Sequence, residues 1–316
     1  MDESSAAFRP PSSPPPEADV LTCTARPSVF FGPHGLRAGW GALLFVVICV
    51  LVLAGLAYGA HVVFHYRPPG AMRELTPALA FSGEAMQIAA ALLATWAMAR
   101  IEGRRFGAYG FRGERFFPLF VRGLAIGFGA LSLLIVFLDA TGVWHYDGVH
   151  MRGWAAWQYG LIWAAVFVMV GVAEEMTMRG YLLATLTRGM GIWPAAILLS
   201  LLFGALHLNN AGEDPFGIVE VVCASLMLSY VIWRTGSLAM AFGVHAAWDW
   251  AQSFLYGTAD SGLHTRGFLL SSHSSGSAWL SGGPAGPEGS ILAIPVTALV
   301  VIAVHFTAGA RRPYPE

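Results

Sequence analysis

The sequence predicts an all-α, polytopic membrane protein, built as a bundle of about eight transmembrane helices. Of its 316 residues, 56% are hydrophobic and only 12% are charged, whereas soluble domains usually carry about 25% charged residues. The mean hydropathy is +0.59, and apolar stretches close to the ~20 residues that a membrane-spanning helix needs recur along the chain. This composition excludes a soluble globular domain, and the net charge of −1 argues against a nucleic-acid-binding surface.

Each predicted span is an apolar stretch bounded by polar or turn-forming residues. The fourth span is longer than a crossing requires, so it tilts or carries an interfacial extension. The fifth is short for a crossing. The eight predicted spans are 40–64, 78–99, 120–143, 156–187, 193–210, 216–235, 237–257 and 290–309.

The segments outside the spans define the domain organisation. Residues 1–38 are rich in Pro, Ser and Ala, which predicts a disordered cytoplasmic tail ahead of a transmembrane domain at 39–312. Residues 258–289 are rich in Gly and Ser and too polar to span. This loop is either a flexible external segment or one that folds back over the mouth of a site.

The arginines predict the orientation of the chain. All 18 basic residues are Arg, and with eight spans and an internal N-terminus, 13 of them fall on the inner side and four on the outer side. Positive residues accumulate on the cytoplasmic side of membrane proteins. Both termini are therefore predicted to be cytoplasmic.

Three short motifs place ionisable side chains at membrane depth, where such groups are costly and usually functional. They are Glu174-Glu175-x-x-x-Arg179, Phe203-x-x-x-His207 and His245-x-x-x-Asp249.

Helical spacing predicts how these side chains are arranged. Glu175 and Arg179 are four residues apart, so they can pair on one helix face, and Glu174 lies about 100° away and can face the bundle interior. The same spacing lets Phe203 pack one turn from His207. Counted from the cytoplasmic helix ends at 1.5 Å per residue, the four polar groups Glu174, His207, His245 and Asp249 lie about 12–21 Å deep.

These residue types are suited to hydrolysis. A carboxylate in a dry site can accept a proton from water, a histidine can share that water, and a second histidine with a polar partner can hold an oxyanion. The same four groups, Glu174, His207, His245 and Asp249, could instead bind zinc, since two histidines, a carboxylate and a water form a common catalytic set. Glu84 and Glu220 also fall in or near spans, where they are interpreted as interfacial or interhelical groups.

Taken together, the three motifs resemble the CPBP family, which includes the type II CAAX prenyl proteases and the Abi proteins. The resemblance covers about residues 160–257 and implies a catalytic core at about 156–257, and the continuation from Arg179 through Leu182 is similar as well. It implies an intramembrane endopeptidase in which Glu174 activates water with His207. It further implies that His245 and residue 249 stabilise the oxyanion, with Glu175, Arg179 and Phe203 in support.

One residue departs from the eukaryotic prenyl proteases, which have Asn at the position of Asp249. An ionised Asp cannot donate a hydrogen bond to an oxyanion. This difference raises two alternatives for Asp249, namely orienting His245 or helping to bind a metal.

The resemblance implies a bacterial plasma (inner) membrane location and, as partners, the lipid bilayer and a membrane-associated protein or peptide substrate. The favoured interpretation requires no cofactor, and a divalent metal such as zinc is the alternative. Two other functions stay open at this point. One is a proton- or ion-coupled transporter, since buried carboxylates and histidines also build proton relays. The other is a non-catalytic membrane scaffold or immunity protein.

Overall fold

The computed structural model describes residues 29–32, 35–64, 74–111, 115–210, 215–309 and 314. Most of the predicted disordered tail, residues 1–28, lies outside this part of the chain. Within the remainder of that tail, strand β1 (Phe31–Gly32) pairs antiparallel with β2 (Gly35–Leu36), directly ahead of the first helix.

Each of the eight predicted spans is a helix or a run of helices, which confirms the all-α membrane architecture. The first three are α1 (Ala38–Phe64), α2 (Pro77–Ile101) and α3 (Phe116–Ala140). The fourth consists of α4 (Gly153–Glu175), the π-helical segment η2 (Met176–Leu182) and α5 (Leu183–Met190). The others are α6 (Ile192–His207), α7 (Pro215–Thr235), α8 (Ala239–Trp250) with η3 (Ala251–Leu255), and α10 (Ala293–Thr307).

Within the described residues, five helical segments are long and apolar enough to cross a bilayer on their own, including the 38 residues from Gly153 to Met190. The segments α6 and α10 are apolar but shorter. At 1.5 Å per residue, the 16 residues of α6 extend about 24 Å, less than the ~30 Å hydrocarbon core. The chain is a multi-pass membrane protein whose helices differ in length.

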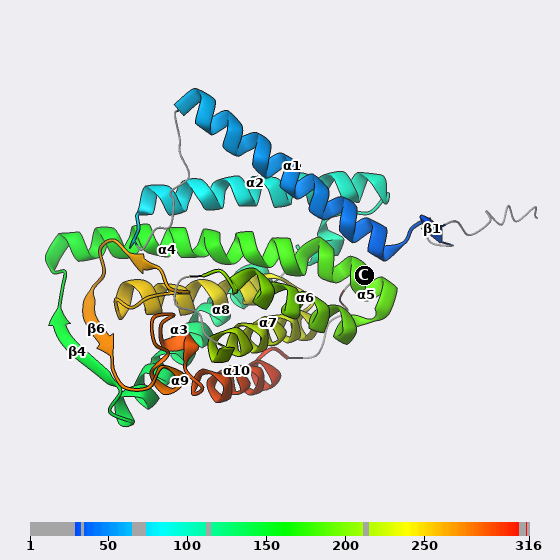
Figure 1. Ribbon diagram of the computed structural model, residues 1–316. Coiled ribbons are helices and arrows are strands. Elements are labelled where there is room, and N and C mark those ends of the chain that lie inside the picture. The colour runs from blue at the N-terminus through cyan, green and yellow to red at the C-terminus, as the bar shows by residue number, and fades with distance from the viewer. Residues whose placement is uncertain are drawn as a thin grey trace, which may run out of the picture.

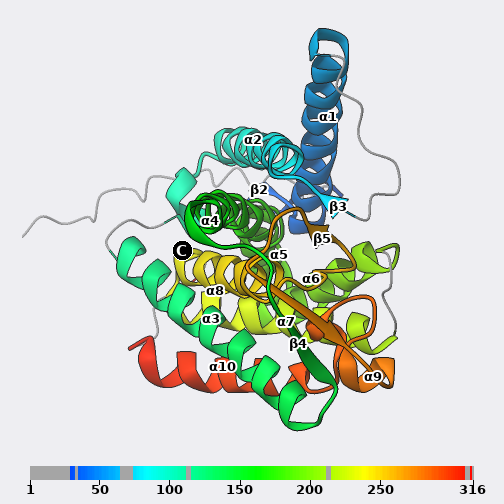
Figure 2. The same ribbon diagram turned by 90° about the vertical axis from the view of Figure 1, so that its left-hand side faces the viewer.

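Figures 1 and 2 show α4 running through the middle of the molecule. Helices α2 and α1 lie on one side of it, and α8, α3, α7 and α10 lie on the other. The central position of α4 matters for function because its last turn carries the first predicted motif.

Glycines hold α8 against α3 at very short range. A Cβ added at Gly123 would collide with the carbonyl oxygen of Met240, one at Gly127 with that of Val244, and one at Gly243 with that of Phe120. Such backbone-to-backbone packing through small residues is the typical way in which helices associate in membranes. It fixes the position of α8, which carries the third motif.

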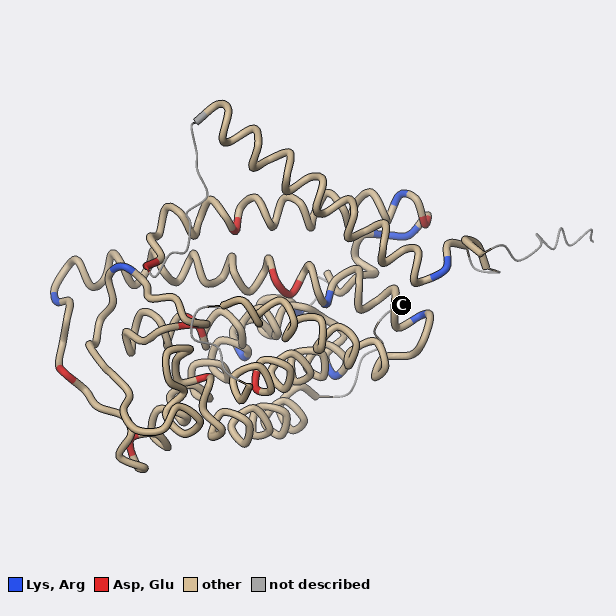
Figure 3. Tube along the Cα trace, in the orientation of Figure 1, with Lys and Arg blue, Asp and Glu red and all other residues tan. Residues whose placement is uncertain are grey.

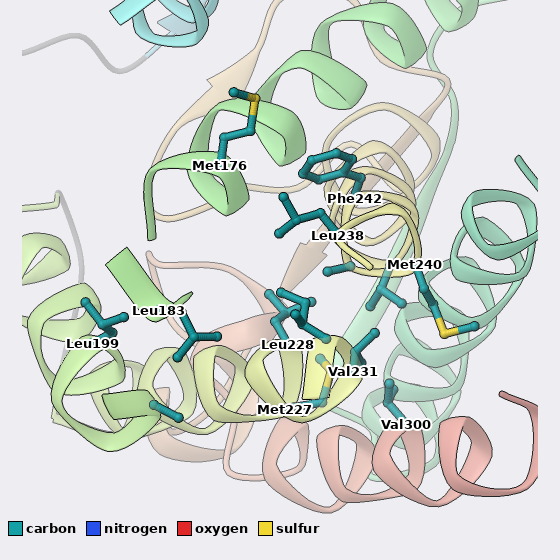
Figure 4. Close-up of a cluster of buried hydrophobic side chains, with 14 of the residues drawn as sticks. Met176, Leu183, Leu199, Met227, Leu228, Val231, Leu238, Met240, Phe242 and Val300 are labelled. Atoms are coloured by element: carbon teal, nitrogen blue, oxygen red, sulfur yellow. The ribbon is translucent and has the colours of Figure 1, made fainter. Parts of the chain in front are cut away.

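The core is formed by aliphatic and methionine side chains that several helices contribute. Figure 4 shows Leu183, Leu199, Leu228, Val231 and Phe242 meeting between the helices, and all are buried. Charged residues are sparse along these helices, and acidic and basic segments adjoin near the end of α4 (Figure 3). The few charged groups inside the bundle are therefore concentrated at one place.

The 258–289 loop is ordered by strands that the sequence did not predict. Strand β6 (Leu270–Ser274) pairs antiparallel with β4 (Trp144–Val149), and β5 (His264–Thr265) pairs parallel with β3 (Glu74–Leu75). A short helix, α9 (Ala278–Ser281), and the 3₁₀ turn η4 (Pro287–Gly289) lead into α10. Of the two alternatives for this loop, the structure has the one that folds back onto the bundle.

Candidate active site

The first motif lies where α4 widens into a π-helical turn. Glu174 and Glu175 end α4, and η2 begins at Met176. At Gly180 the backbone leaves helical geometry, with ψ at −105°, before α5 resumes the helix. Inserted π turns of this kind often occur at functional sites because they re-aim side chains.

Glu175 and Arg179 form the ion pair that their spacing predicted. The Nη1 of Arg179 lies 2.6 Å from Oε1 of Glu175, and both side chains have an exposed fraction of 0%. Two fully buried opposite charges must stay paired, because separating them would leave an uncompensated charge in a low-dielectric interior.

Two further helices complete the surroundings of Arg179. Its Nη2 donates a hydrogen bond of 2.6 Å to Oγ of Ser225 on α7, and its guanidinium lies 4.8 Å from the ring centroid of Phe203 on α6. Phe203 also packs on His207, with 4.5 Å between ring centroids. Phe203 therefore contacts two of the predicted site residues.

His245 on α8 lies among three carboxylates. Its Nδ1 is 3.0 Å from Oε1 of Glu175, and its Nε2 is 3.6 Å from Oε2 of Glu174 and 3.5 Å from Oδ2 of Asp249. Carboxylates only accept hydrogen bonds when ionised, so the Nδ1–H of His245 donates to Glu175. Through this contact the Glu175–Arg179 pair holds the imidazole ring in place.

His207 approaches the same region from the end of α6. Its Nδ1 is 2.8 Å from the carbonyl oxygen of Phe203. A carbonyl can only accept, so in this arrangement Nδ1 carries the proton and Nε2 is left as an acceptor. Among the described residues, no hydrogen bond or ion pair joins His207 to Glu174, and the imidazole in contact with Glu174 is that of His245.

A single cavity of about 260 Å³ collects these groups. The side chains of Glu174, His207, His245 and Asp249, from three helices, all line it. Glu174 is more open than His245 and Asp249, with 28% of its side chain exposed against 14% and 10%. A water or a peptide in this space would meet Glu174 directly.

The cavity also contains carboxyl groups that the motifs did not indicate. Glu84 from α2 and Glu220 from α7, which the sequence suggested to be interfacial or interhelical, line it, and Oγ1 of Thr297 donates to Glu220 over 2.9 Å. The only sequence signal for these two was an acidic residue inside an apolar span.

The folded-back loop adds Asp260 and Glu288 to the wall. The backbone N–H of Ser261 donates to Glu288 over 2.6 Å, and the hydroxyl of Ser253 donates to Asp260 over 3.0 Å. Burial raises the pKa of both carboxyls above their ordinary values, and the nearby charge of Asp249 adds to the effect at Asp260.

The turn that presents Glu288 depends on a glycine. Gly286 has a φ of +117°, and a Cβ there would collide with the carbonyl oxygen of Ala259. The sequence contained this signal as the Gly286-Pro287-Glu288 run, which the three-motif reasoning did not connect to the site.

The arrangement of the carboxylates and histidines in the cavity bears on the zinc alternative. Within the described ranges, no three His, Cys, Asp or Glu side chains are arranged to hold a metal ion as they stand. The described residues as placed do not fit a zinc site.

A comparison with known protein families gives a match. Residues 154–251 match the family described as type II CAAX prenyl endopeptidase Rce1-like. The matched segment contains all three motifs and the helices α4 to α8 that carry them. No curated protein and no solved structure matched the chain.

The match agrees with the resemblance that the motifs predicted, and with a polytopic helical structure whose motif residues converge on one cavity. The match over residues 154–251 therefore supports a relation of this segment to the CPBP and CAAX protease family.

Proposed function

We propose that the protein is an intramembrane endopeptidase that hydrolyses a peptide bond of a membrane-associated protein or peptide, with Glu174 as the general base. The observation that carries this proposal is the convergence of Glu174, His207, His245 and Asp249 on one cavity inside a membrane-embedded bundle. Paired, positioned carboxyl and imidazole groups are what hydrolysis of an amide requires.

The reaction begins with a water held between Glu174 and the free Nε2 of His207. Glu174 takes a proton from this water as its oxygen attacks the substrate carbonyl carbon. When the tetrahedral intermediate collapses, the C–N bond breaks and the proton passes from Glu174 to the leaving amine. One product ends in a new carboxyl group, which keeps the second proton of the water, and the other product ends in a new amine.

The developing oxyanion is stabilised by His245. In its protonated form the ring donates from Nδ1 to Glu175 and from Nε2 toward the cavity, where the oxyanion would lie. The distance of 3.5 Å between Nε2 and Oδ2 of Asp249 supports an orienting role for Asp249. This assignment removes the difficulty that an ionised Asp has no proton to donate.

The proposed mechanism uses only these side chains and requires no resident metal. The substrate is a membrane-associated polypeptide, because the cavity lies within the helical bundle. The family description names prenyl endopeptidases, so a lipid-modified peptide is one substrate class to test.

The test compares cleavage products in membranes that contain the wild type or Glu174→Gln, identified by mass spectrometry of new peptide termini. Gln keeps the shape of Glu but cannot take a proton, so we expect the products to disappear while the protein still inserts and accumulates. The matched control is Glu84→Gln, a change of another carboxyl in the same cavity, which should retain the products. Cleavage by purified Glu174→Gln at a rate near that of the wild type would overturn the assignment of the base.

A further inference from the structure

A chain of buried polar contacts runs from α6 through α7 and η2 to the imidazole of His245. Its first member is Ser200 on α6, and the second is Ser225 on α7, both almost completely buried. The Oγ of Ser225 donates to Oγ of Ser200 over 2.8 Å and accepts from Nη2 of Arg179 over 2.6 Å. Neither serine belongs to the three motifs.

The chain continues from Arg179 to the site. Arg179 binds Glu175 over 2.6 Å, and the same oxygen of Glu175, Oε1, accepts from Nδ1 of His245 over 3.0 Å. One carboxylate oxygen thus serves both the guanidinium and the imidazole. A shift of the guanidinium would move the oxygen that holds His245.

The direction of the hydrogen bonds gives Ser225 a specific role. A hydroxyl has a single proton, and that of Ser225 points to Ser200. Its lone pairs are therefore turned toward the guanidinium. Ser200 fixes the rotation of the hydroxyl, and the hydroxyl fixes the position of Arg179.

The network has little redundancy. Among the described buried side-chain atoms, Nε of Arg179 and Oε2 of Glu175 have no hydrogen-bond partner. The ion pair is therefore held by one nitrogen and one oxygen, and Ser225 supplies the second anchor of the guanidinium. Phe203 covers the guanidinium face at 4.8 Å but leaves its position in the ring plane unfixed.

Three residues on one face of α6 contribute to this network and to the cavity. Ser200, Phe203 and His207 follow the i, i+3, i+7 pattern and so lie on one face of the helix. That face meets the guanidinium through Ser225 and Phe203, and it meets the cavity through His207.

From these contacts we infer that Ser225, oriented by Ser200, is a positioning residue that holds His245 through Arg179 and Glu175. This inference rests on the proposed proteolytic function. Ser225 also lines the cavity, so a direct contact with substrate is the competing explanation that an experiment has to separate.

The experiment compares steady-state cleavage of a membrane peptide by Ser225→Ala, Ser225→Thr and Ser200→Ala. Loss of a hydrogen bond to a charged group should lower kcat of Ser225→Ala about tenfold or more with KM unchanged. Thr keeps the hydroxyl and should restore most of kcat, and Ser200→Ala should give a smaller loss because the Ser225 hydroxyl remains. A raised KM with wild-type kcat in Ser225→Ala would show substrate contact and overturn the inference.

Ser229→Ala is the matched control. Ser229 is a buried serine one turn further along α7, and its hydroxyl donates to the backbone carbonyl of Ser225 over 3.0 Å, away from the guanidinium. We expect this variant to keep wild-type kcat and KM. An equal loss of kcat in Ser229→Ala and Ser225→Ala would mean that any cavity in α7 impairs the enzyme, which would also overturn the inference.

A second readout does not depend on proteolysis. In detergent-solubilised protein labelled with ¹⁵N-histidine, the ring signals of His245, assigned by their loss in His245→Gln, should shift in Ser225→Ala and not in Ser229→Ala. If the His245 signals shift in Ser225→Ala but the wild type cleaves no peptide, the proposed function is refuted and the positioning role of Ser225 is retained. If the His245 signals do not shift and kcat is unchanged in Ser225→Ala, the positioning role of Ser225 is refuted, and the proposed function is not affected.

Discussion

Replacing Arg179 by Met should destabilise the protein strongly. The change removes the 2.6 Å contacts to Glu175 and Ser225 and the cation–π contact with Phe203, at a position with no exposed surface. Glu175 would remain buried with His245 as its partner. Removing one member of a buried ion pair typically costs about 3–5 kcal/mol.

Two changes at the Phe203 ring modify this free-energy cost in opposite directions. A desolvated cation–π contact contributes about 2 kcal/mol, and a methionine sulfur against the Phe203 ring returns about 0.3–1.5 kcal/mol. The exchange at the Phe203 ring therefore adds about 0.5–1.7 kcal/mol to the loss, and the charge left on Glu175 remains the largest contribution. In the double variant Glu175→Gln/Arg179→Met no unpaired charge remains, and most of the stability should return.

Equilibrium unfolding in mixed micelles, at increasing fractions of a denaturing detergent, measures these differences. Arg266→Ala serves as the control, because Arg266 and Glu74 also form an ion pair but are more than half exposed. We expect this control to unfold like the wild type, since exposed pairs contribute little. The reasoning is refuted if Arg179→Met unfolds at the wild-type midpoint, or if the double variant is no more stable than Arg179→Met.

Three further outcomes follow. Burial and the charge of Asp249 raise the pKa of Asp260, so the folded state keeps a proton that the unfolded chain releases, and stability falls as pH rises above about 4. The melting temperature of Asp260→Asn relative to wild type should therefore increase from pH 4 to pH 7, and a constant difference would contradict this. Protein purified without chelator should contain far less than one equivalent of zinc by elemental analysis, and stoichiometric zinc that disappears with activity in His207→Ala would make the enzyme a metalloprotease. A reporter fused at Glu316 should be active only if it is of the cytoplasmic type, and a periplasmic signal would mean that the number of crossings is wrong by one.

The sequence predicted the helices well because crossing a bilayer requires long apolar segments, a signal that does not depend on tertiary contacts. The pairing of Glu175 with Arg179 was also predictable, since both lie on one helix. The motif residues could be named for the same reason: ionisable groups in apolar spans are rare.

Contacts between segments that are distant in the sequence could not be predicted from the sequence. Glu84 reaches the cavity from α2, and Asp260 reaches it from the loop after α8. Their distance from the motifs along the sequence does not predict that they lie near the motif residues in the fold. Strands of two to six residues carry too little periodicity to predict, so the β4–β6 pairing was missed. Ser200 and Ser225 gave no signal because single serines are common in membrane helices.

The glycine contact between α3 and α8 determines which walls of the cavity can move. Helices that meet backbone to backbone at Gly127 and Val244 have no layer of flexible side chains on which to slide. Helix α1 is different: only 11% of its apolar window is buried, and it is anchored near its start, where Phe45 stacks on Tyr181 at 4.9 Å. Its other end stands clear of the bundle in Figures 1 and 2.

Under the proposed function, this difference assigns the entry of a membrane-bound peptide to the side of the molecule formed by α1 and α2. A swing of α1 about the Phe45–Tyr181 contact, with adjustment of α2, would change the wall that Glu84 occupies. The imidazole of His245 and the carboxylate of Asp249 would stay fixed to α3 throughout. The side of the cavity formed by α8 is thus fixed by close backbone packing against α3, whereas the opposite side is formed by α2, which packs against the sparsely buried helix α1.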